Sequence, residues 1–136
     1  MNQAAETVKV VHIKGEIFSG NGEGSKFIQL PWVKKQIAEK LGFIPYPGTL
    51  NIKLTEDITG FKKLLKKKKP IDITPERGFC RGKCFDVCLT NNLKCAIVLP
   101  EIVDYPENVI EVIAPINLKE ELRLKDGDVV EVKIMP

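Results

Sequence analysis

The sequence contains no segment that would anchor the protein in a membrane or export it. No apolar run approaches the ~18 residues that a membrane-spanning helix needs. The N-terminal stretch, MNQAAETVKVVHIKG, has neither the hydrophobic core nor the cleavage site of a signal peptide. The 43% hydrophobic and 29% charged residues are typical of a globular protein. We therefore expect a cytoplasmic protein with a single domain over residues 1–136, of which about the first six are flexible.

Side chains suited to binding transition metals are also scarce. His12 is the single histidine, and no cysteine is near it in sequence, so we interpret it as a packed or surface residue. The spacing of Cys80, Cys84, Cys88 and Cys95 differs from that of zinc knuckles. We interpret these cysteines as small apolar residues of a β-hairpin, and a disulfide and a metal site are the alternatives.

The two standard phosphate-binding glycine motifs, G-x4-G-K-[ST] and G-x-G-x-x-G, are absent. A different glycine-rich segment, SGNGEGSKF, covers residues 19–27 and has glycines at alternate positions. Glycine permits positive φ and a close approach of the backbone to a ligand, and successive N–H groups can bind an anion. Lys26 adds a positive charge. The segment predicts a phosphate-binding loop, with a flexible hairpin turn as the alternative.

Two oxygen-bearing side chains follow a rigid turn. The segment GFIPYPGTLNIKL, residues 42–54, joins a predicted helix to a predicted strand, and its prolines stiffen the turn. Thr49 and Asn51 are two positions apart, so they face the same side of the strand. A magnesium ion takes one or two such oxygens together with phosphate and water. The pair predicts a Mg²⁺ site, and the alternative is that both side chains only satisfy local backbone groups.

The remaining patterns predict a mainly β protein with a small closed barrel of about six strands. Strands outnumber helices and do not alternate regularly with them, which argues against a parallel Rossmann-type sheet. Pro31 and Gly42 mark the start and end of a helix inserted after the first strand. Short additional helices are expected at 60–69 and after Asn117. The predicted strands cover residues 7–18, 49–54 and 108–113, the two arms of a hairpin at 79–99 with its turn at 90–92, and VVEVKIM at the C-terminus.

Two charged features have roles that depend on where they face. The segment GFKKLLKKKK, residues 60–69, predicts an amphipathic helix with solvated lysines, and a nucleic-acid-binding surface is the alternative. Glu111 lies in the predicted strand NVIEVI, where alternation places it opposite its two apolar neighbours. It is either a solvated side chain or, if that face lines a pocket, a general base or a hydroxyl-binding group.

Four segments resemble, in order and spacing, the archaeal-type CTP-dependent riboflavin kinases. They are S-G-N-G-E-G (19–24), L-G-F-x-P-Y-x-G-T-L-N (41–51), I-E-V-I-A-P (110–115) and L-K-D-G-D (124–128). The resemblance extends from about Val10 to Ile134. It implies a cradle-loop barrel that transfers the γ-phosphoryl group of CTP to the 5′-hydroxyl of riboflavin, giving FMN and CDP. Mg²⁺ is the implied cofactor.

The resemblance also implies a set of site residues. Thr49 and Asn51 would bind Mg²⁺, Val103 and Glu111 would contact the flavin, and Glu111 would act as the catalytic base. Family members often have threonine at the position of Val103, and arginine where this chain has Ser25 followed by Lys26. The nucleotide would contact Gly20, Asn21, Gly22, Glu23, Gly24, Ser25, Ile116, Asn117, Leu118 and Lys119.

Two other function classes remain open. The lysine run and LKDGDVVEV also fit a small nucleic-acid-binding β-barrel, whose affinity would fall steeply with salt. A flavin- or nucleotide-binding module without catalysis would keep the pocket but not turn over CTP. We expect a monomer whose partners are CTP or CDP and riboflavin or FMN, with neither nucleic acid nor a membrane as a partner.

Overall fold

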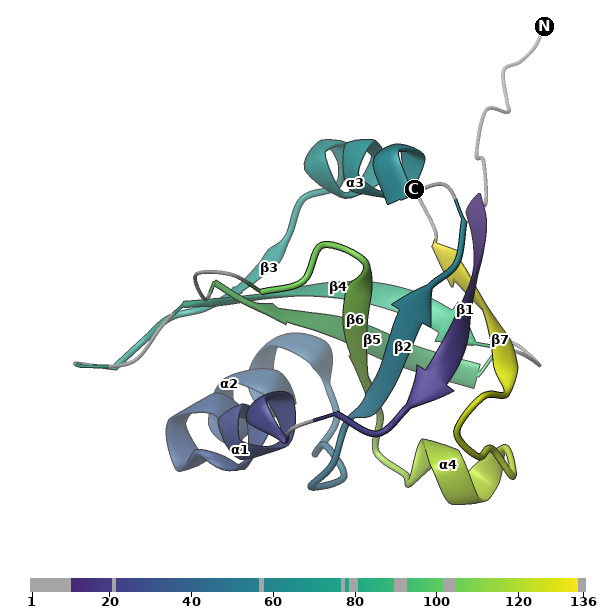
Figure 1. Ribbon diagram of the computed structural model, residues 1–136. Helices are drawn as coiled ribbons and strands as arrows, with labels where there is room; N and C mark the ends of the chain where they lie inside the picture. Colours follow the sequence, from purple (N-terminus) through teal and green to yellow (C-terminus); the bar gives the residue numbers. More distant parts are fainter. Residues whose placement is uncertain are drawn as a thin grey trace, which may run out of the picture.

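The strands form a single antiparallel sheet that closes into a barrel (Figure 1). The computed structural model describes residues 11–20, 22–56, 58–76, 78, 81–89, 93–101 and 105–134. The strand order is β3-β4-β5-β6-β2-β1-β7, and pairing of β4 with β7 closes six of the strands while β3 extends β4 on the outside. The predicted mainly β barrel of six strands is thereby confirmed. The strands are β1 (Val11–Phe18), β2 (Leu50–Leu54), β3 (Ile71–Ile73), β4 (Gly82–Leu89), β5 (Leu93–Pro100), β6 (Val109–Ile113) and β7 (Val129–Ile134).

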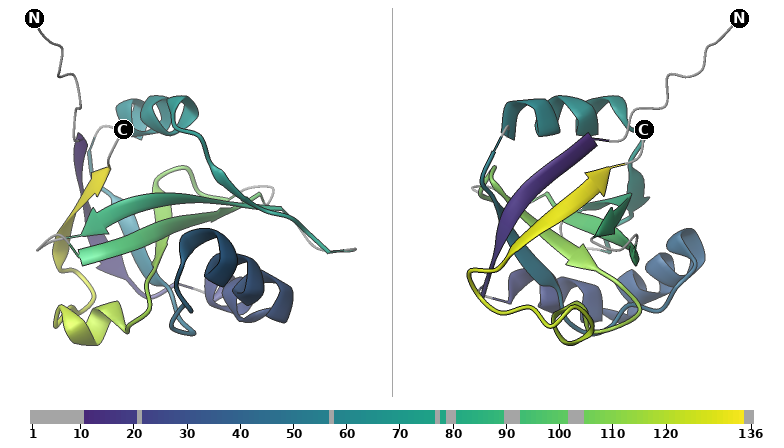
Figure 2. Two further views of the ribbon diagram at one scale, coloured as in Figure 1. Left: turned by 180° about the vertical axis from the view of Figure 1, so that it is seen from behind. Right: turned by 90° about the vertical axis from the view of Figure 1, so that its right-hand side faces the viewer.

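Four helices surround the barrel in the part of the chain that the structure describes. They are α1 (Glu23–Gln29), α2 (Pro31–Leu41), α3 (Ile58–Lys67) and α4 (Leu118–Glu121). Figures 1 and 2 show α1 and α2 side by side against the long β4–β5 hairpin, while α3 and α4 lie at opposite ends of the barrel. Helix α2 matches the sequence prediction, with Pro31 in its first turn and Gly42 in the left-handed conformation at its end.

The structure has two helices between β1 and β2 where the sequence predicted one. The second half of the glycine-rich segment is helical, because Gly22 takes a left-handed conformation (φ 85°) and α1 starts directly after it. Leu30 is extended and separates α1 from α2. The prediction of a loop over residues 19–27 is therefore wrong from Glu23 onward.

The described residues form two hydrophobic cores, and β6 contributes to both. Ile110 and Val112 belong to the core inside the barrel. Ile113 points the other way and belongs to a second core, which α1 and α2 form with the outer face of the sheet. Both faces of β6 are covered, so its side chains from Ile110 to Ile113 are buried whichever face they occupy.

Strand β3 was not predicted. Its three residues lie between Pro70 and Pro75, and these prolines were expected to interrupt regular secondary structure. It pairs with β4 between Ile71 and Cys84. The β4–β5 hairpin is confirmed. Its predicted turn at 90–92, like residues 1–10, lies outside the described residues.

The cysteines that the structure describes are free and mostly buried, as predicted. Cys84 and Cys95 are buried in β4 and β5, Cys88 is half-buried, and Cys80 lies outside the described residues. Burial raises the pKa of both the Cys84 and the Cys95 thiol to about 12. These thiols stay protonated at neutral pH and act as apolar groups.

His12 is an exposed surface residue, as expected, and its Nδ1 atom lies 2.9 Å from the Glu131 carboxylate. Across the described residues, no helix combines the length and apolarity needed to cross a membrane.

Candidate active site

Three oxygen-bearing side chains meet on the outer face of the barrel beside α1. Asn51 in β2 is paired in register with Glu111 in β6. Thr49 immediately precedes β2, and its hydroxyl donates a hydrogen bond of 2.7 Å to Oε1 of Glu111. On the other side of β6, Glu111 is paired with Val98, a residue of the helix-covered core. The cluster therefore lies outside the barrel, at the edge of the core that α1 and α2 cover.

Glu111 is a buried carboxylate with a hydrogen bond to each oxygen. Its exposed fraction is 4%, and it is the one charged residue that is buried in the described part of the chain. The hydroxyl of Tyr105 donates to Oε2 at 2.7 Å, whereas that of Thr49 donates to Oε1. A buried carboxylate is tolerated only when its oxygens are satisfied in this way. The interpretation of Glu111 as a solvated side chain is wrong, because the residue is buried. Its alternative role, as a general base or a hydroxyl-binding group, stays a prediction.

Tyr105 is held in its protonated form next to this carboxylate. Burial, together with the hydrogen bond to Glu111 and its negative charge, raises the pKa of the Tyr105 hydroxyl above its ordinary value. The hydroxyl therefore remains a hydrogen-bond donor at any physiological pH.

Two glycines of the segment 19–27 are in close contact with the cluster. A Cβ atom on Gly24 would overlap the carboxylate of Glu111. A Cβ atom on Gly20 would lie 2.7 to 2.9 Å from the side-chain amide atoms of Asn51, closer than carbon atoms pack. The sequence predicted that these glycines make room for phosphate. In the structure they also make room for Asn51 and Glu111.

Ser25 connects α1 to the turn before β2. Its hydroxyl oxygen accepts a hydrogen bond of 3.2 Å from the backbone N–H of Thr49. This bond, together with the contacts of Gly20 and Gly24, fixes the glycine-rich segment directly over the cluster.

The second predicted nucleotide-binding segment, residues 116–119, lies on the other side of Thr49. A cavity of about 50 Å³ separates Thr49 from Asn117 and its neighbours. Asn117 accepts a hydrogen bond from the N–H of Glu120 and so caps the short helix expected after it. Its Nδ2 donates to the hydroxyl of Tyr46 at 3.0 Å.

Asp126 joins the two predicted nucleotide-binding segments. Its carboxylate accepts a hydrogen bond of 2.7 Å from the Ser19 hydroxyl and lies 3.0 Å from the Lys119 ammonium. The bond from Ser19 and the contact with Lys119 lower the pKa of the Asp126 carboxyl. Because Asp126 is exposed, its contact with Lys119 links the two segments but contributes little to the stability of the fold.

The structure brings together most, but not all, of the site residues expected from the sequence. Asn21, Val103 and the side chain of Glu23 lie outside the described residues. Tyr105 and Tyr46 were missed as site residues. Tyr46 lies in the turn that precedes Thr49, so its closeness in sequence to the predicted metal ligands could have marked it as a site residue. No pattern in the sequence marks Tyr105.

The donor set suits a hard cation rather than a transition metal. The described residues contain no group of three or more histidine, cysteine, aspartate or glutamate side chains that could hold a metal ion. Thr49 and Asn51 instead offer a hydroxyl and an amide oxygen beside the Glu111 carboxylate. Magnesium binds few protein oxygens and completes its shell with water and phosphate, so these residues fit it.

Comparison with known proteins identifies relatives over nearly the whole chain. A family model named CTP-dep_RFKase, described as "Domain of unknown function DUF120", matches residues 17–134. A protein of Archaeoglobus fulgidus named riboflavin kinase is 43% identical over 129 residues, which are 92% of this chain and 55% of the relative. Proteins of the same name from Methanosarcina barkeri and Pyrobaculum aerophilum are 40% and 41% identical, over 92% of this chain and 57% and 61% of their own lengths.

The chain thus spans between half and two thirds of the length of these relatives. The family match agrees with the resemblance noted in the sequence, and it includes every residue of the Thr49–Asn51–Glu111 cluster. This protein belongs to the CTP-dep_RFKase family.

Proposed function

We propose that this protein is a CTP-dependent riboflavin kinase, which transfers the γ-phosphoryl group of CTP to the 5′-hydroxyl of riboflavin and releases FMN and CDP. The observation that carries the proposal is the buried Glu111 carboxylate, held by Thr49 beside Asn51 and under the glycine-rich segment. The names of the relatives support riboflavin as the substrate.

CTP would bind between the two segments that flank Thr49, residues 20–25 and 116–119. Asp126 links these two segments before a nucleotide arrives. The cavity beside Asn117 is small, about 50 Å³, so we expect the side chains around it to move when the nucleotide binds.

Thr49 and Asn51 would hold Mg²⁺, which, when bound, neutralises negative charge on the phosphate groups. Both ligands are neutral, so they leave the charge of the ion available to the nucleotide. In the structure the Thr49 hydroxyl already donates a hydrogen bond to Glu111 and lies 3.5 Å from the Ser25 hydroxyl. A hydroxyl oxygen has two lone pairs, so that of Thr49 can still offer one to a metal ion.

Glu111 would accept a hydrogen bond from the 5′-hydroxyl of riboflavin and orient it toward the phosphorus. An ionised carboxylate has about four lone-pair sites, so it can accept this bond in addition to those from Thr49 and Tyr105. As the bond to phosphorus forms, the carboxylate takes the proton of the hydroxyl. Phosphoryl transfer has a loose transition state, so positioning contributes more than basicity.

The test is to incubate the protein with riboflavin, Mg²⁺ and each of the four nucleoside triphosphates, and to separate FMN from riboflavin by chromatography. We expect FMN with CTP and much less with the others. Formation of FMN with ATP but not CTP would refute the donor preference, and no FMN with any donor would refute the proposed function.

A further inference from the structure

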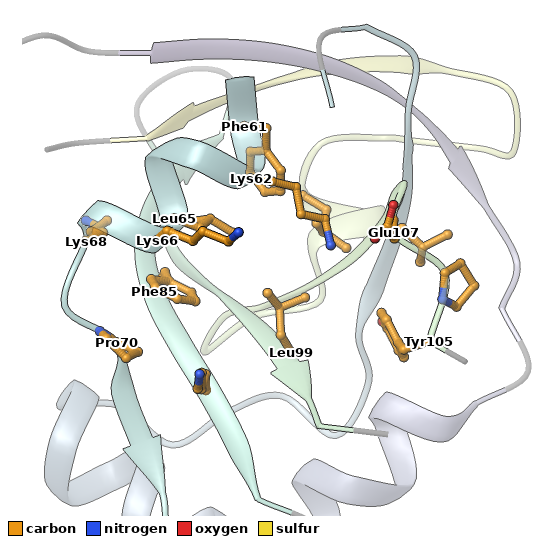
Figure 3. A pocket seen from close by; sticks show the side chains of 14 residues that line it. Phe61, Lys62, Leu65, Lys66, Lys68, Pro70, Phe85, Leu99, Tyr105 and Glu107 are labelled. Atoms are coloured by element: carbon orange, nitrogen blue, oxygen red, sulfur yellow. The ribbon is translucent and has the colours of Figure 1, made fainter. Parts of the chain in front are cut away.

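Tyr105 is shared by the candidate active site and a groove on the side of the barrel. The groove has a volume of about 460 Å³, and Figure 3 shows it between α3 and the segment that carries Tyr105. The lysine run was predicted to be a solvated face, but three of its lysines line this groove: Lys62, Lys66 and Lys68. The role of Tyr105 follows from its other neighbour, Glu111.

The hydroxyl of Tyr105 is fixed on the carboxylate. The side chain lines the groove, and its hydroxyl donates a hydrogen bond of 2.7 Å to Oε2 of Glu111. Glu111 is buried, so turning the hydroxyl away would leave one carboxylate oxygen without this donor. Leaving a buried acceptor unsatisfied costs more than an ordinary hydrogen bond contributes. The contact between Tyr105 and Glu111 is therefore a stable part of the site.

The two donors to Glu111 are not equivalent. Thr49, which donates to Oε1, is also a proposed ligand of Mg²⁺, and its hydroxyl lies 3.5 Å from that of Ser25. Its surroundings therefore change when the metal ion and the nucleotide bind. Among the described residues, the hydroxyl of Tyr105 has Glu111 as its hydrogen-bond partner. Tyr105 is thus the donor whose position does not depend on the metal.

Tyr105 is also a neutral donor. An ammonium or guanidinium group in its place would neutralise the carboxylate and weaken it as an acceptor for a substrate hydroxyl. A phenol hydroxyl orients the carboxylate and leaves its negative charge available. The raised pKa of Tyr105 keeps this hydroxyl protonated, so it can donate but does not compete with Glu111 for a proton.

We propose that Tyr105 is a positioning residue for the phosphoryl transfer, an inference that rests on the proposed kinase function. Tyr105 acts through Glu111: it anchors Oε2, so that the lone pairs used by neither Tyr105 nor Thr49 face the 5′-hydroxyl of riboflavin. In-line transfer tolerates little error in the position of the attacking hydroxyl, and a misplacement of about 1 Å can cost about 10²-fold in rate. Loss of the anchor should therefore lower turnover more than affinity.

The test starts with Tyr105→Phe, which removes the hydroxyl and keeps the ring. We expect kcat to fall about tenfold, while the affinities for CTP, by calorimetry, and for riboflavin, by quenching of flavin fluorescence, stay within about threefold. The control is Thr55→Val, which removes a hydroxyl that donates to the Lys14 carbonyl at 3.3 Å beyond the other end of β2. It should leave kcat unchanged.

A double-mutant cycle tests whether Tyr105 acts through Glu111. In Glu111→Ala there is no carboxylate to hold, so adding Tyr105→Phe should lower turnover by less than about twofold more. A tenfold loss in both backgrounds would show that Tyr105 acts independently of Glu111 and would overturn the inference. If circular dichroism shows that Tyr105→Phe alone does not fold, this comparison decides, because the double variant leaves no buried charge without a partner.

The outcomes separate this inference from the kinase function. Unchanged kcat in Tyr105→Phe, or a loss of substrate affinity that accounts for the whole effect, would overturn the inference and leave the kinase function standing. If the unmodified protein forms no FMN with any donor, both fail.

Discussion

At the scale of single residues, the site depends on the buried carboxylate of Glu111. Among the described residues its hydrogen-bond partners are two hydroxyl groups, and none of them is a cation. Thr49 and Tyr105 each donate to one oxygen of Glu111. Hydrogen bonds to a charged acceptor are roughly twice as strong as neutral ones, which offsets part of the cost of burial. The two hydroxyl groups also fix the direction in which the carboxylate faces a substrate.

Substitutions of Glu111 separate positioning from proton transfer. Glu111→Gln keeps the shape and one acceptor oxygen, so we expect it to retain more FMN formation than Glu111→Ala, which should lose about 10²-fold or more. Both variants should bind CTP with unchanged affinity, measured by calorimetry, because CTP is expected on residues 20–25 and 116–119. Weaker CTP binding with normal riboflavin binding would show that Glu111 contacts CTP and that its assignment to riboflavin is wrong.

The close contact between Gly24 and Glu111 makes a second prediction. Gly24→Ala puts a methyl group where the carboxylate lies, so it should displace Glu111 and lower turnover at least about tenfold. Gly42→Ala is the control, because Gly42 has φ 83° but open space around it. It should cost about 1 kcal/mol of stability and leave turnover intact at 25 °C. Similar turnover in the two variants would contradict the steric argument.

At the scale of elements, segments with a strong local signal were predictable, and those defined by tertiary contacts were not. Helix α2 and the β4–β5 hairpin have clear end signals and apolar periodicity. Helix α1 starts between Gly22 and Gly24 and has just seven residues, and β3 has three, so neither shows a pattern long enough to recognise. Helix α1 forms because it packs on the outer face of the sheet, and β3 forms because it pairs with the edge of β4.

The buried cysteines of the β4–β5 hairpin predict a loss of stability at high pH. The pKa of an unfolded cysteine is about 8.5, and burial raises the pKa of Cys84 and Cys95 to about 12. Between these values the unfolded chain loses protons that the folded protein keeps. Stability is therefore complete below about pH 8.5 and falls as pH rises toward 12.

Urea unfolding at several pH values from neutral to about 10.5 measures this decline. Cys84→Ala with Cys95→Ala should be less stable at neutral pH, because two small cavities form, but its stability should fall less with pH. Parallel declines of the two proteins would show that other groups cause the alkaline loss.

At the scale of the whole molecule, the barrel and the Thr49–Asn51 pair could be predicted, but the environment of Glu111 could not. Alternation along β6 correctly separates Glu111 from Ile110 and Val112. It cannot reveal that α1 and α2 cover the second face, since that depends on where the helices pack after the chain folds. For the same reason the lysine run gave no sign of a groove: the residues opposite it come from β4, β5 and the segment around Tyr105.

The division into two cores means that the site and the barrel need not unfold together. The glycine-rich segment and α1 belong to the helical layer, and that layer rests on a smaller core than the one inside the barrel. Amides of α1 and α2 should therefore exchange with deuterium faster than those of β1 and β2, and activity should vanish on warming before the strands melt. We therefore expect the first effect of heat to be local and reversible on cooling: α1 and α2 separate from the sheet while the barrel stays folded.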